Sequence, residues 1–285
     1  MKKAAMILEG GAVRGVFSSG VLDYLMEQEC YLPHVIGVSA GSCNAIDYVS
    51  RQKGRTRDCV IRAGKEDGKL INLRNAVKNK SLFDMDLLFE IDPNEKHPFD
   101  YETYFASKMT CEIVVTNCIT GQAEYLQEKQ NRERLMKLCR ASSSIPVVSP
   151  MVTIDSVPYL DGGIADSIPL IHSLRQGFRK NVLVLTRNRG YRKTMSRKSM
   201  AFYRAALGKY PELLRSVCLR PYHYNRIMTY IEKWEDEGKI FVIRPQIRTV
   251  SRTESNPQTL MAFYKHGYEQ MKENYDGLLE YLNGK

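Results

Sequence analysis

The pentapeptide Gly37-Val38-Ser39-Ala40-Gly41 stands between a short apolar run, residues 35–38, and a helical pattern that extends to about residue 52. The G-x-S-x-G spacing suits a tight turn between a strand and a helix, because small flanking residues relieve crowding where the serine hydroxyl is exposed. The following helix would add its positive N-terminal end beside that hydroxyl. We therefore predict that Ser39 is the nucleophile of an acyl hydrolase, supported by the two glycines that flank it.

The pattern around this turn predicts an α/β fold. Residues 3–9 are typical of a strand and residues 14–30 of a helix, so the chain begins β-α-β-α, which implies a parallel sheet covered by helices. Two hairpins are expected at 111–118 with 122–127, and at 151–154 with 157–160. Further strands are expected at 182–186 and 240–243, and a C-terminal helix at about 257–282.

A glycine-rich turn, Gly10-Gly11-Ala12-Val13-Arg14-Gly15, follows the first strand directly. Glycines here let the backbone turn sharply and come close to a ligand, with N–H groups directed outward at a helix start. Such a turn binds an anion, either a phosphate or the oxyanion of a tetrahedral intermediate. The segment lacks the Lys-Ser/Thr of a P-loop and the GxGxxG spacing, which argues against nucleotide binding.

A third segment, Asp161-Gly162-Gly163, ends the second hairpin. Asp-Gly is a common turn dipeptide, so a plain turn explains this segment when it is taken alone. The alternative is that Asp161 is a functional carboxylate placed at the end of a strand.

Composition and charge narrow the class of protein. The 285 residues are 43% hydrophobic and 26% charged, as in ordinary globular proteins, and no apolar run approaches the roughly 20 residues of a membrane-spanning helix. The net charge is +10, yet residues 170–252 hold 19 Lys/Arg and only 5 Asp/Glu, with a dense run at 187–198. Such a region is either a solvated basic face or a surface for an anionic partner.

The seven cysteines include no CxxC pair, so we expect reduced, largely buried thiols in a cytoplasmic protein, with no bound metal and no cofactor. The short apolar stretch near residue 4 is read as a first strand and not as a signal peptide.

Taken together, GGAVRG, GVSAG and DGG occur here in the order found in patatin-like phospholipases, and the chain resembles that family, most closely a bacterial branch. The stretch Ala-Ser-Ser-Ser-Ile-Pro at 141–146 is similar to the family segment that precedes the Asp strand. The resemblance covers roughly residues 4–185. It implies a three-layer α/β/α core with a largely parallel central sheet and a helical cap.

The resemblance also implies a Ser39–Asp161 dyad without histidine, an oxyanion hole formed by the N–H groups of Gly10, Gly11 and Ala12, and support from Arg14, Gly15, Gly37, Gly41, Gly162 and Gly163. Ala12 departs from the family's glycine triplet, and its oxyanion role is expected to require a negative φ. Arg14 either holds the loop in place or meets a lipid phosphate. The serine follows only the second expected strand, whereas α/β-hydrolases of the Ser-His-Asp type place several strands before it.

We expect one catalytic domain over residues 1–285, with a core at about 4–186 and 239–285 and an inserted helical cap at about 187–238. The expected substrate is a lipid or another ester, with peripheral contact to an anionic membrane at its inner face through residues 187–198 and no nucleic-acid partner. Two other functions remain open. An acyltransferase would use the same acyl-enzyme, and a non-catalytic lipid- or nucleotide-binding protein would use the basic run.

Overall fold

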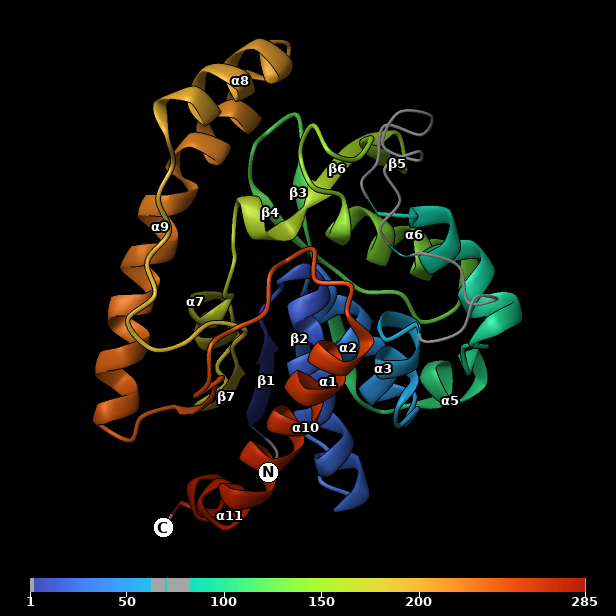
Figure 1. Ribbon diagram of the computed structural model, residues 1–285, viewed down its shortest axis with the longest axis vertical. Helices are drawn as coiled ribbons and strands as arrows, with labels where there is room; N and C mark the ends of the chain where they lie inside the picture. Colours follow the sequence, from blue (N-terminus) through green and yellow to red (C-terminus); the bar gives the residue numbers. More distant parts are fainter. Residues whose placement is uncertain (1–2, 63–69, 71–82, 285) are drawn as a thin grey trace.

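The protein was analysed as a computed structural model, which describes residues 3–62, 70 and 83–284. Its described strands form one sheet in the order β5-β6-β3-β2-β1-β7-β8, with β4 paired to β3 (Figure 1). The strands are β1 (Ala4–Leu8), β2 (His34–Val38), β3 (Thr110–Asn117), β4 (Ala123–Leu126), β5 (Val152–Ile154), β6 (Val157–Asp161), β7 (Lys180–Val184) and β8 (Phe241–Ile243). The predicted strands are therefore all present, each within a few residues of its expected bounds.

The centre of the sheet is parallel. β1 lies between β2 and β7, β2 pairs with β3, and β7 pairs with β8, all in parallel register. The two predicted hairpins, β3–β4 and β5–β6, are antiparallel, and β6 also pairs with β3 in antiparallel register. This β6–β3 pairing brings the end of β6 back beside the end of β2, because Val114 faces Val38 and Val115 faces Asp161.

One face of the sheet packs against most of the helices. Side chains that alternate along the strands, among them Met6, Val35 and Ile113, form a core cluster with residues of these helices. The elements on this side are α1 (Gly15–Glu27), α2 (Ala40–Val49), α3 (Arg55–Val60), the π-helix η2 (Leu87–Lys96), α5 (Tyr101–Ala106), α6 (Arg132–Ser143), α10 (Pro257–Glu273) and α11 (Tyr275–Asn283).

The opposite face carries a second helical layer made of α7 (Leu170–Arg175) and the long helix α9 (Pro211–Asp236). Ile7, Ile36 and Leu183, which point away from the first cluster, pack with Tyr224 and Met228 of α9. The three-layer α/β/α architecture predicted from the sequence is confirmed. The segment between β7 and β8 is helical as expected, but its longer helix is also part of the layer that covers the sheet.

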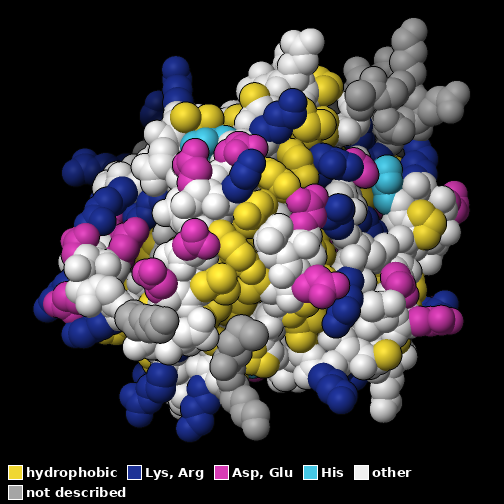
Figure 2. All heavy atoms as spheres, turned by 90° about the horizontal axis from the view of Figure 1, so that it is seen from below, with side chains coloured by type: hydrophobic (Ala, Val, Ile, Leu, Met, Phe, Trp, Pro, Cys, Tyr) yellow, Lys and Arg dark blue, Asp and Glu magenta, His cyan; other side chains and the backbone are white. Residues whose placement is uncertain are grey.

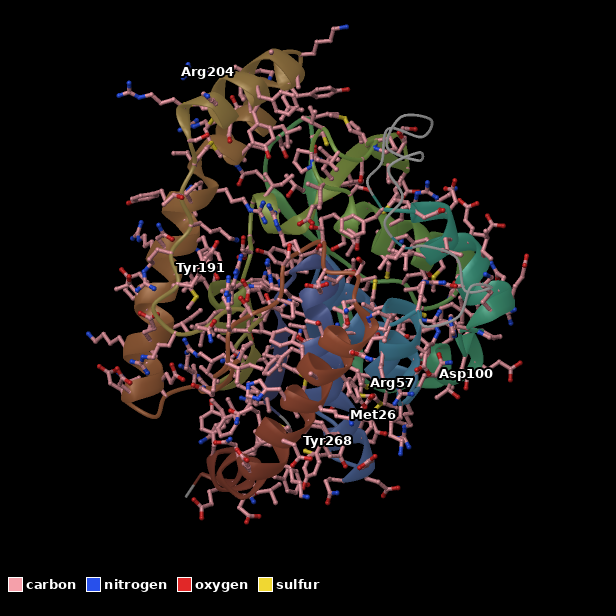
Figure 3. All side chains as sticks on the ribbon, in the orientation of Figure 1. Met26, Arg57, Asp100, Tyr191, Arg204 and Tyr268 are labelled. Atoms are coloured by element: carbon pink, nitrogen blue, oxygen red, sulfur yellow. The ribbon has the colours of Figure 1, made fainter. Side chains whose placement is uncertain are left out.

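The remaining helix of this segment, α8 (Arg197–Leu207), packs against the first turns of α9 and projects from the body, with Arg204 at its outer end (Figures 1 and 3).

The surface at the end of the molecule where both chain termini lie mixes Lys/Arg with Asp/Glu around exposed hydrophobic side chains (Figure 2). The positive excess of the chain is therefore not gathered on this end of the molecule.

The C-terminal helix expected over 257–282 is two helices, and the prediction of one continuous helix was wrong. The break falls at Asn274, which has φ −104 and ends α10. Its side-chain amide donates to the carbonyl oxygen of Gln270 at 2.8 Å. Asparagine side chains compete in this way with the helical ladder, which favours a helix end.

All seven cysteines are unpaired, and five of them are buried, as predicted. No helix among the described residues is long and apolar enough to span a bilayer.

Candidate active site

Ser39 occupies a strained turn between β2 and α2. Its backbone has φ 56 and ψ −128, a region that a non-glycine residue occupies only when the surrounding structure enforces it. The side chain is 8% exposed and reaches the wall of a cavity of about 290 Å³. Ser39 thus lies at the tip of a strand–helix turn, where it is largely buried but lines a cavity.

Ser142 on α6 holds this turn in place. The backbone N–H of Ser39 donates to Ser142 Oγ at 2.8 Å, and the Ser142 hydroxyl donates to the carbonyl oxygen of Val114 at 2.6 Å. On the other side, Ser42 Oγ donates to the Ser39 carbonyl oxygen at 2.6 Å. Ser142 belongs to the 141–146 stretch that the sequence singled out only by resemblance. Its contact with Ser39 spans 103 positions in sequence, so no local pattern could reveal it.

Asp161 ends β6 and lies beside Ser39. Its carboxylate accepts a hydrogen bond from the Gly163 N–H at 2.8 Å, and the Ser39 hydroxyl lies close enough to lower the pKa of the carboxyl group. The side chain is buried, with 5% of its surface exposed. Burial raises the pKa of Asp161 above the usual carboxyl range, while the positive charge of Arg220 and the nearby Ser39 hydroxyl oppose part of that rise. A less acidic carboxylate is a stronger base toward a hydroxyl.

The glycine loop lies against the serine. A Cβ on Gly10 would fall 2.6 Å from Ser39 Cβ, so only glycine allows this approach. Among the described residues, no protein acceptor takes the backbone N–H of Gly10, Gly11 or Ala12. Ala12 has φ 53, so the expectation of a negative φ at this position was wrong. The loop must turn through the left-handed region at Ala12 to enter the short 3-10 turn η1 (Ala12–Arg14) and then α1.

The other glycines of the three motifs are sites of close backbone packing. At each of them a Cβ would lie no farther than 3.0 Å from a neighbouring atom; these glycines are Gly11, Gly15, Gly37, Gly41, Gly162 and Gly163. The three segments predicted from the sequence are therefore tightly packed on one another at the carboxyl ends of β1, β2 and β6.

Another part of the cavity wall comes from the basic region, in which the sequence analysis assigned no residue to the site. Lys193, Tyr191 and Arg220 line it, on the segment after β7 and on α9. Lys193 Nζ lies 3.6 Å from the centre of the Tyr224 ring and donates to Ser167 Oγ at 3.3 Å. Loss of solvent lowers the pKa of Lys193 well below the usual lysine range, and the nearby Arg220 lowers it further.

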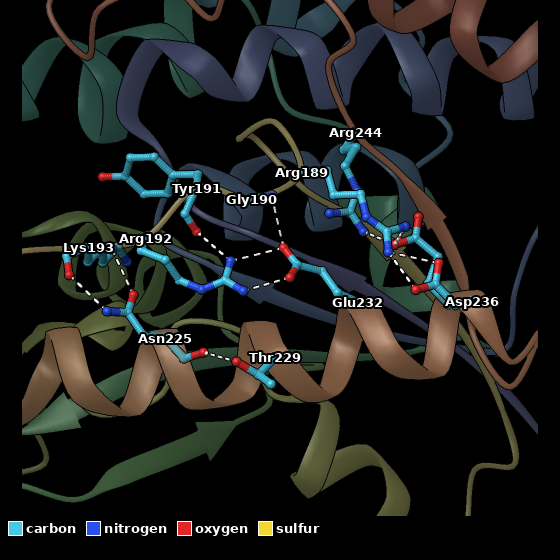
Figure 4. Close-up of polar contacts among 11 residues, drawn as sticks. Arg189, Gly190, Tyr191, Arg192, Lys193, Asn225, Thr229, Glu232, Asp236 and Arg244 are labelled. Atoms are coloured by element: carbon cyan, nitrogen blue, oxygen red, sulfur yellow. Dashed lines mark hydrogen bonds and ion pairs between the residues drawn. The ribbon is translucent and has the colours of Figure 1, made fainter.

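Polar contacts fasten this wall to α9 (Figure 4). Arg192 forms a two-bond ion pair with Glu232, at 2.9 and 2.6 Å, and the Lys193 N–H donates to the side-chain oxygen of Asn225 at 2.7 Å. Figure 3 places Tyr191 between the body of the molecule and α9. Lys193 is thus held at the cavity by its backbone, while its ammonium group stays available to the site.

Arg14 is the charged residue of the glycine loop. It is 6% exposed, it lines the cavity, and its Nε has no hydrogen-bond partner among the described residues. Loss of solvent, with the positive charge of Arg187 adding to it, lowers the pKa of Arg14 to about 10. The structure therefore provides no side-chain hydrogen bond by which Arg14 would hold the loop.

The histidines lie elsewhere. His172 Nε2 is 2.8 Å from a carboxylate oxygen of Glu112, and its ring stacks on Tyr125 with centroids 3.4 Å apart. None of the five histidines, all within the described ranges, lines the cavity at Ser39.

A family model described as patatin-like phospholipase matches residues 6–173, which contain the glycine loop, the serine turn and Asp161. The chain belongs to the patatin-like phospholipase family. A second model, for a domain of unknown function named DUF6363, matches residues 210–283. That match begins at the start of α9 and runs through β8 to α11.

Two similar proteins accompany these matches. The chain is 30% identical over 255 residues to the uncharacterized protein YjjU of Escherichia coli (strain K12), covering 85% of this chain and 68% of YjjU. The crystal structure of VipD from Legionella pneumophila aligns with a TM-score of 0.47 and 14% identity, covering 97% of this chain and 67% of that one. The predicted membership of a patatin-like family with bacterial relatives is confirmed, which places the chain among lipid acyl hydrolases.

Proposed function

We propose that this protein is a serine lipid acyl hydrolase in which Ser39 is the nucleophile and Asp161 the general base. The observation that carries the proposal is that Ser39, on its strained turn, and the buried Asp161 carboxylate line one wall of the same cavity. In a patatin-like chain this pair supports an esterase of the phospholipase A or lysophospholipase type.

The first half of the reaction forms an acyl-enzyme. Ser39 Oγ attacks the ester carbonyl carbon while its proton passes to Asp161, and the tetrahedral oxyanion is stabilised by the N–H groups of Gly10 and Gly11, which have no protein acceptor among the described residues. One such donor contributes about 2.7–4 kcal/mol of transition-state stabilisation in comparable sites. Ala12, with its positive φ, departs from the backbone conformation expected of a third donor. Collapse breaks the ester C–O bond, and the proton on Asp161 goes to the departing alkoxide.

The second half returns the free enzyme. A water molecule gives a proton to Asp161 and attacks the acyl carbon, after which the serine oxygen leaves and takes that proton back. The raised pKa of Asp161 favours both proton transfers, because it brings the base closer to neutrality.

A second cavity supports an acyl chain as the acid part of the substrate. It also includes Ser39 in its lining, and apolar side chains make up much of its wall, among them Val13, Cys59, Leu88 and Phe89. Its volume is about 100 Å³, which suits the first carbons of a chain and not a whole lipid. The serine therefore lies between an apolar and a polar compartment.

Labelling with a fluorophosphonate probe and turnover of p-nitrophenyl butyrate test the dyad together. We expect Ser39→Ala to abolish both labelling and turnover, and Asp161→Asn to reduce kcat about 10³-fold or more while the fold is retained. His172→Ala serves as the control, since its ring contacts Glu112 and Tyr125 outside the cavity. Near wild-type turnover by Asp161→Asn would refute the dyad.

We also propose that residues 1–285 form one catalytic domain, with a core at about 4–186 and 239–285 and the segment 187–238 inserted between β7 and β8.

For localisation we propose the cytoplasm, with the inner membrane face approached through residues 187–198. Arg189 and Arg192 of that run are paired with Asp236 and Glu232, whereas Arg197 and Lys198 on α8 are exposed. Binding to phosphatidylcholine vesicles with and without phosphatidylglycerol, at low and high salt, tests the contact; binding indifferent to both would contradict it.

A further inference from the structure

The polar cavity at Ser39 has an unusual excess of positive charge. Two carboxylates line it, Glu9 and Asp161. Five cationic side chains line it, namely Arg14, Arg187, Lys193, Arg220 and Arg252. They come from four separate parts of the chain: the glycine loop, the segment after β7, the helix α9, and the loop before α10.

None of these five cations is ion-paired within the described part of the chain. Arginines elsewhere pair readily, as Arg55 does with Asp47 and Arg192 with Glu232. The two carboxylates of the cavity are engaged by neutral donors. Glu9 accepts from Thr186 and from the Tyr224 hydroxyl, and Asp161 accepts from Gly163. No cation of the cavity is therefore directly paired with a carboxylate among the described residues, and the cationic side chains outnumber the carboxylates.

Two of the guanidinium groups are also short of hydrogen bonds. Arg14 Nε and Arg220 Nε are buried, and neither has a partner among the described residues. A buried charged donor without an acceptor is costly, so such groups are kept where a ligand supplies the acceptor. Planar guanidinium groups that converge on one cavity match the oxygens of a phosphate, to which they donate two bonds at a time.

We propose that this cavity is a subsite for a phosphomonoester dianion, and that the substrate is an acyl ester whose alcohol part ends in such a phosphate. The proposal rests on the serine hydrolase function proposed above. The phosphate oxygens accept from Arg14 and Arg220 at the inner end, and Arg187 and Arg252 complete the ring of charge. The scissile ester then reaches Ser39, with its acyl chain directed to the apolar cavity.

Charge also defines what the site excludes. A zwitterionic head group such as phosphocholine would place a fixed ammonium ion among five cations, which is unfavourable at these short distances. A neutral glycerol head group would leave the guanidinium groups unsatisfied. The required phosphate is carried by membrane-bound lysophosphatidate-type lipids and also by soluble short-chain acyl glycerol 3-phosphates, and both are included in the test.

Binding is measured apart from catalysis, on the Ser39→Ala protein, by titration calorimetry with glycerol 3-phosphate and with glycerol. We expect glycerol 3-phosphate to bind and glycerol not to bind. Arg252→Gln, in an exposed loop, and Arg220→Gln should each weaken phosphate binding about tenfold or more. Arg215→Gln is the matched control, since Arg215 lies on α9 with its side chain 73% exposed and does not line the cavity.

Turnover is measured with the wild-type chain on four substrates, namely 1-oleoyl-lysophosphatidate, 1-butyryl-glycerol 3-phosphate, 1-oleoyl-lysophosphatidylcholine and monooleoylglycerol. We expect kcat/KM on lysophosphatidate to exceed that on lysophosphatidylcholine at least tenfold, and this ratio to collapse in Arg252→Gln but not in Arg215→Gln. Preference for 1-butyryl-glycerol 3-phosphate would assign the phosphate to a soluble substrate.

The outcomes separate the two proposals. Absence of glycerol 3-phosphate binding, or equal turnover of all four substrates, would overturn the phosphate subsite while Ser39 remained an active nucleophile. Phosphate binding that depends on Arg252 and Arg220, in a chain that hydrolyses no ester and takes no fluorophosphonate label, would retain the subsite and refute the hydrolase.

Discussion

Removing the Ser142 hydroxyl tests how the strained serine turn is maintained. In Ser142→Ala the Ser39 N–H loses its acceptor and the Val114 carbonyl oxygen loses a donor, both in a buried setting. Leaving one buried polar group unsatisfied costs about 1–3 kcal/mol, so the free energy of unfolding should fall by about 2–6 kcal/mol for the two groups. The turn at Ser39 should also relax from φ 56, which lowers kcat because the hydroxyl no longer faces Asp161.

Urea unfolding followed by circular dichroism measures the stability, and p-nitrophenyl butyrate hydrolysis measures the turnover. The matched control is Ser18→Ala on α1, because Ser18 is buried, lines neither cavity, and its hydroxyl has no hydrogen-bond partner among the described residues. Its free energy of unfolding should stay within about 0.5 kcal/mol of the wild type. Equal stability of the two variants would refute the reasoning, since the Ser142 hydrogen bonds would then contribute nothing.

Three further predictions concern the loop, the base and a buried carboxylate. Gly10→Ala places a Cβ 2.6 Å from Ser39 Cβ and should lower kcat about 10²-fold, which is the effect of losing one oxyanion donor. The control Gly277→Ala should leave kcat unchanged, because the nearest atom to its Cβ would be 3.9 Å away. Burial raises the pKa of Asp161, and the carboxylate must be ionised to act as the base. A plot of log kcat/KM against pH should therefore fall with unit slope as the pH drops through a value above about 3.9, the usual pKa of an aspartate. A profile that stays flat down to about pH 3.9 would contradict a buried base. Burial raises the pKa of Asp23 to about 6 in the folded state, so the folded state binds the proton of this carboxyl more tightly than the unfolded state does. The free energy of unfolding should therefore fall by about 3 kcal/mol as the pH rises from about 4 to about 6. Urea unfolding of Asp23→Asn across this range should lack that fall, and a fall of equal size in the variant would assign the titration to another group.

The sequence was sufficient to predict the strands of the sheet and the turns that carry Ser39 and Asp161, because both depend on local patterns. Short apolar runs that alternate with helical periodicity indicate parallel strands, and glycines at fixed offsets indicate tight turns at their ends. Ser39 and Asp161 were predicted from such turns before their contact was seen. That contact depends on the antiparallel β6–β3 pairing, which returns the end of β6 to the end of β2. A hairpin pattern alone does not specify that neighbour.

The wall of the cavity could not be predicted for a different reason. Tyr224, Met228 and Ile231 have helical spacing and indicate an apolar face on α9, but the spacing does not reveal that this face covers Ile7 and Leu183 of the sheet. Once α9 lies there, Arg220 and Lys193 face Asp161 from segments 59 and 32 residues away in sequence. In the sequence both belong to a basic region whose charges are equally compatible with a solvated surface.

Glu9 connects the glycine loop to the segment 187–238, which therefore helps to position the site as well as covering the sheet. It is the residue between β1 and Gly10, it is 3% exposed, and its carboxylate accepts from the Thr186 N–H at 2.7 Å and from the Tyr224 hydroxyl at 3.0 Å. Thr186 Oγ1 in turn donates to the Gly10 carbonyl oxygen at 3.0 Å. The glycine loop is therefore connected through the Glu9 carboxylate to the residues that follow β7 and to α9.

A displacement of α9 that moved Lys193 and Arg220 away from the cavity would break the Tyr224–Glu9 hydrogen bond and leave the buried Glu9 carboxylate with one donor fewer. The cationic wall and the proposed oxyanion loop are consequently held in place together, so a substitution such as Tyr224→Phe should disturb both phosphate binding and turnover although Tyr224 contacts neither the serine nor the cavity.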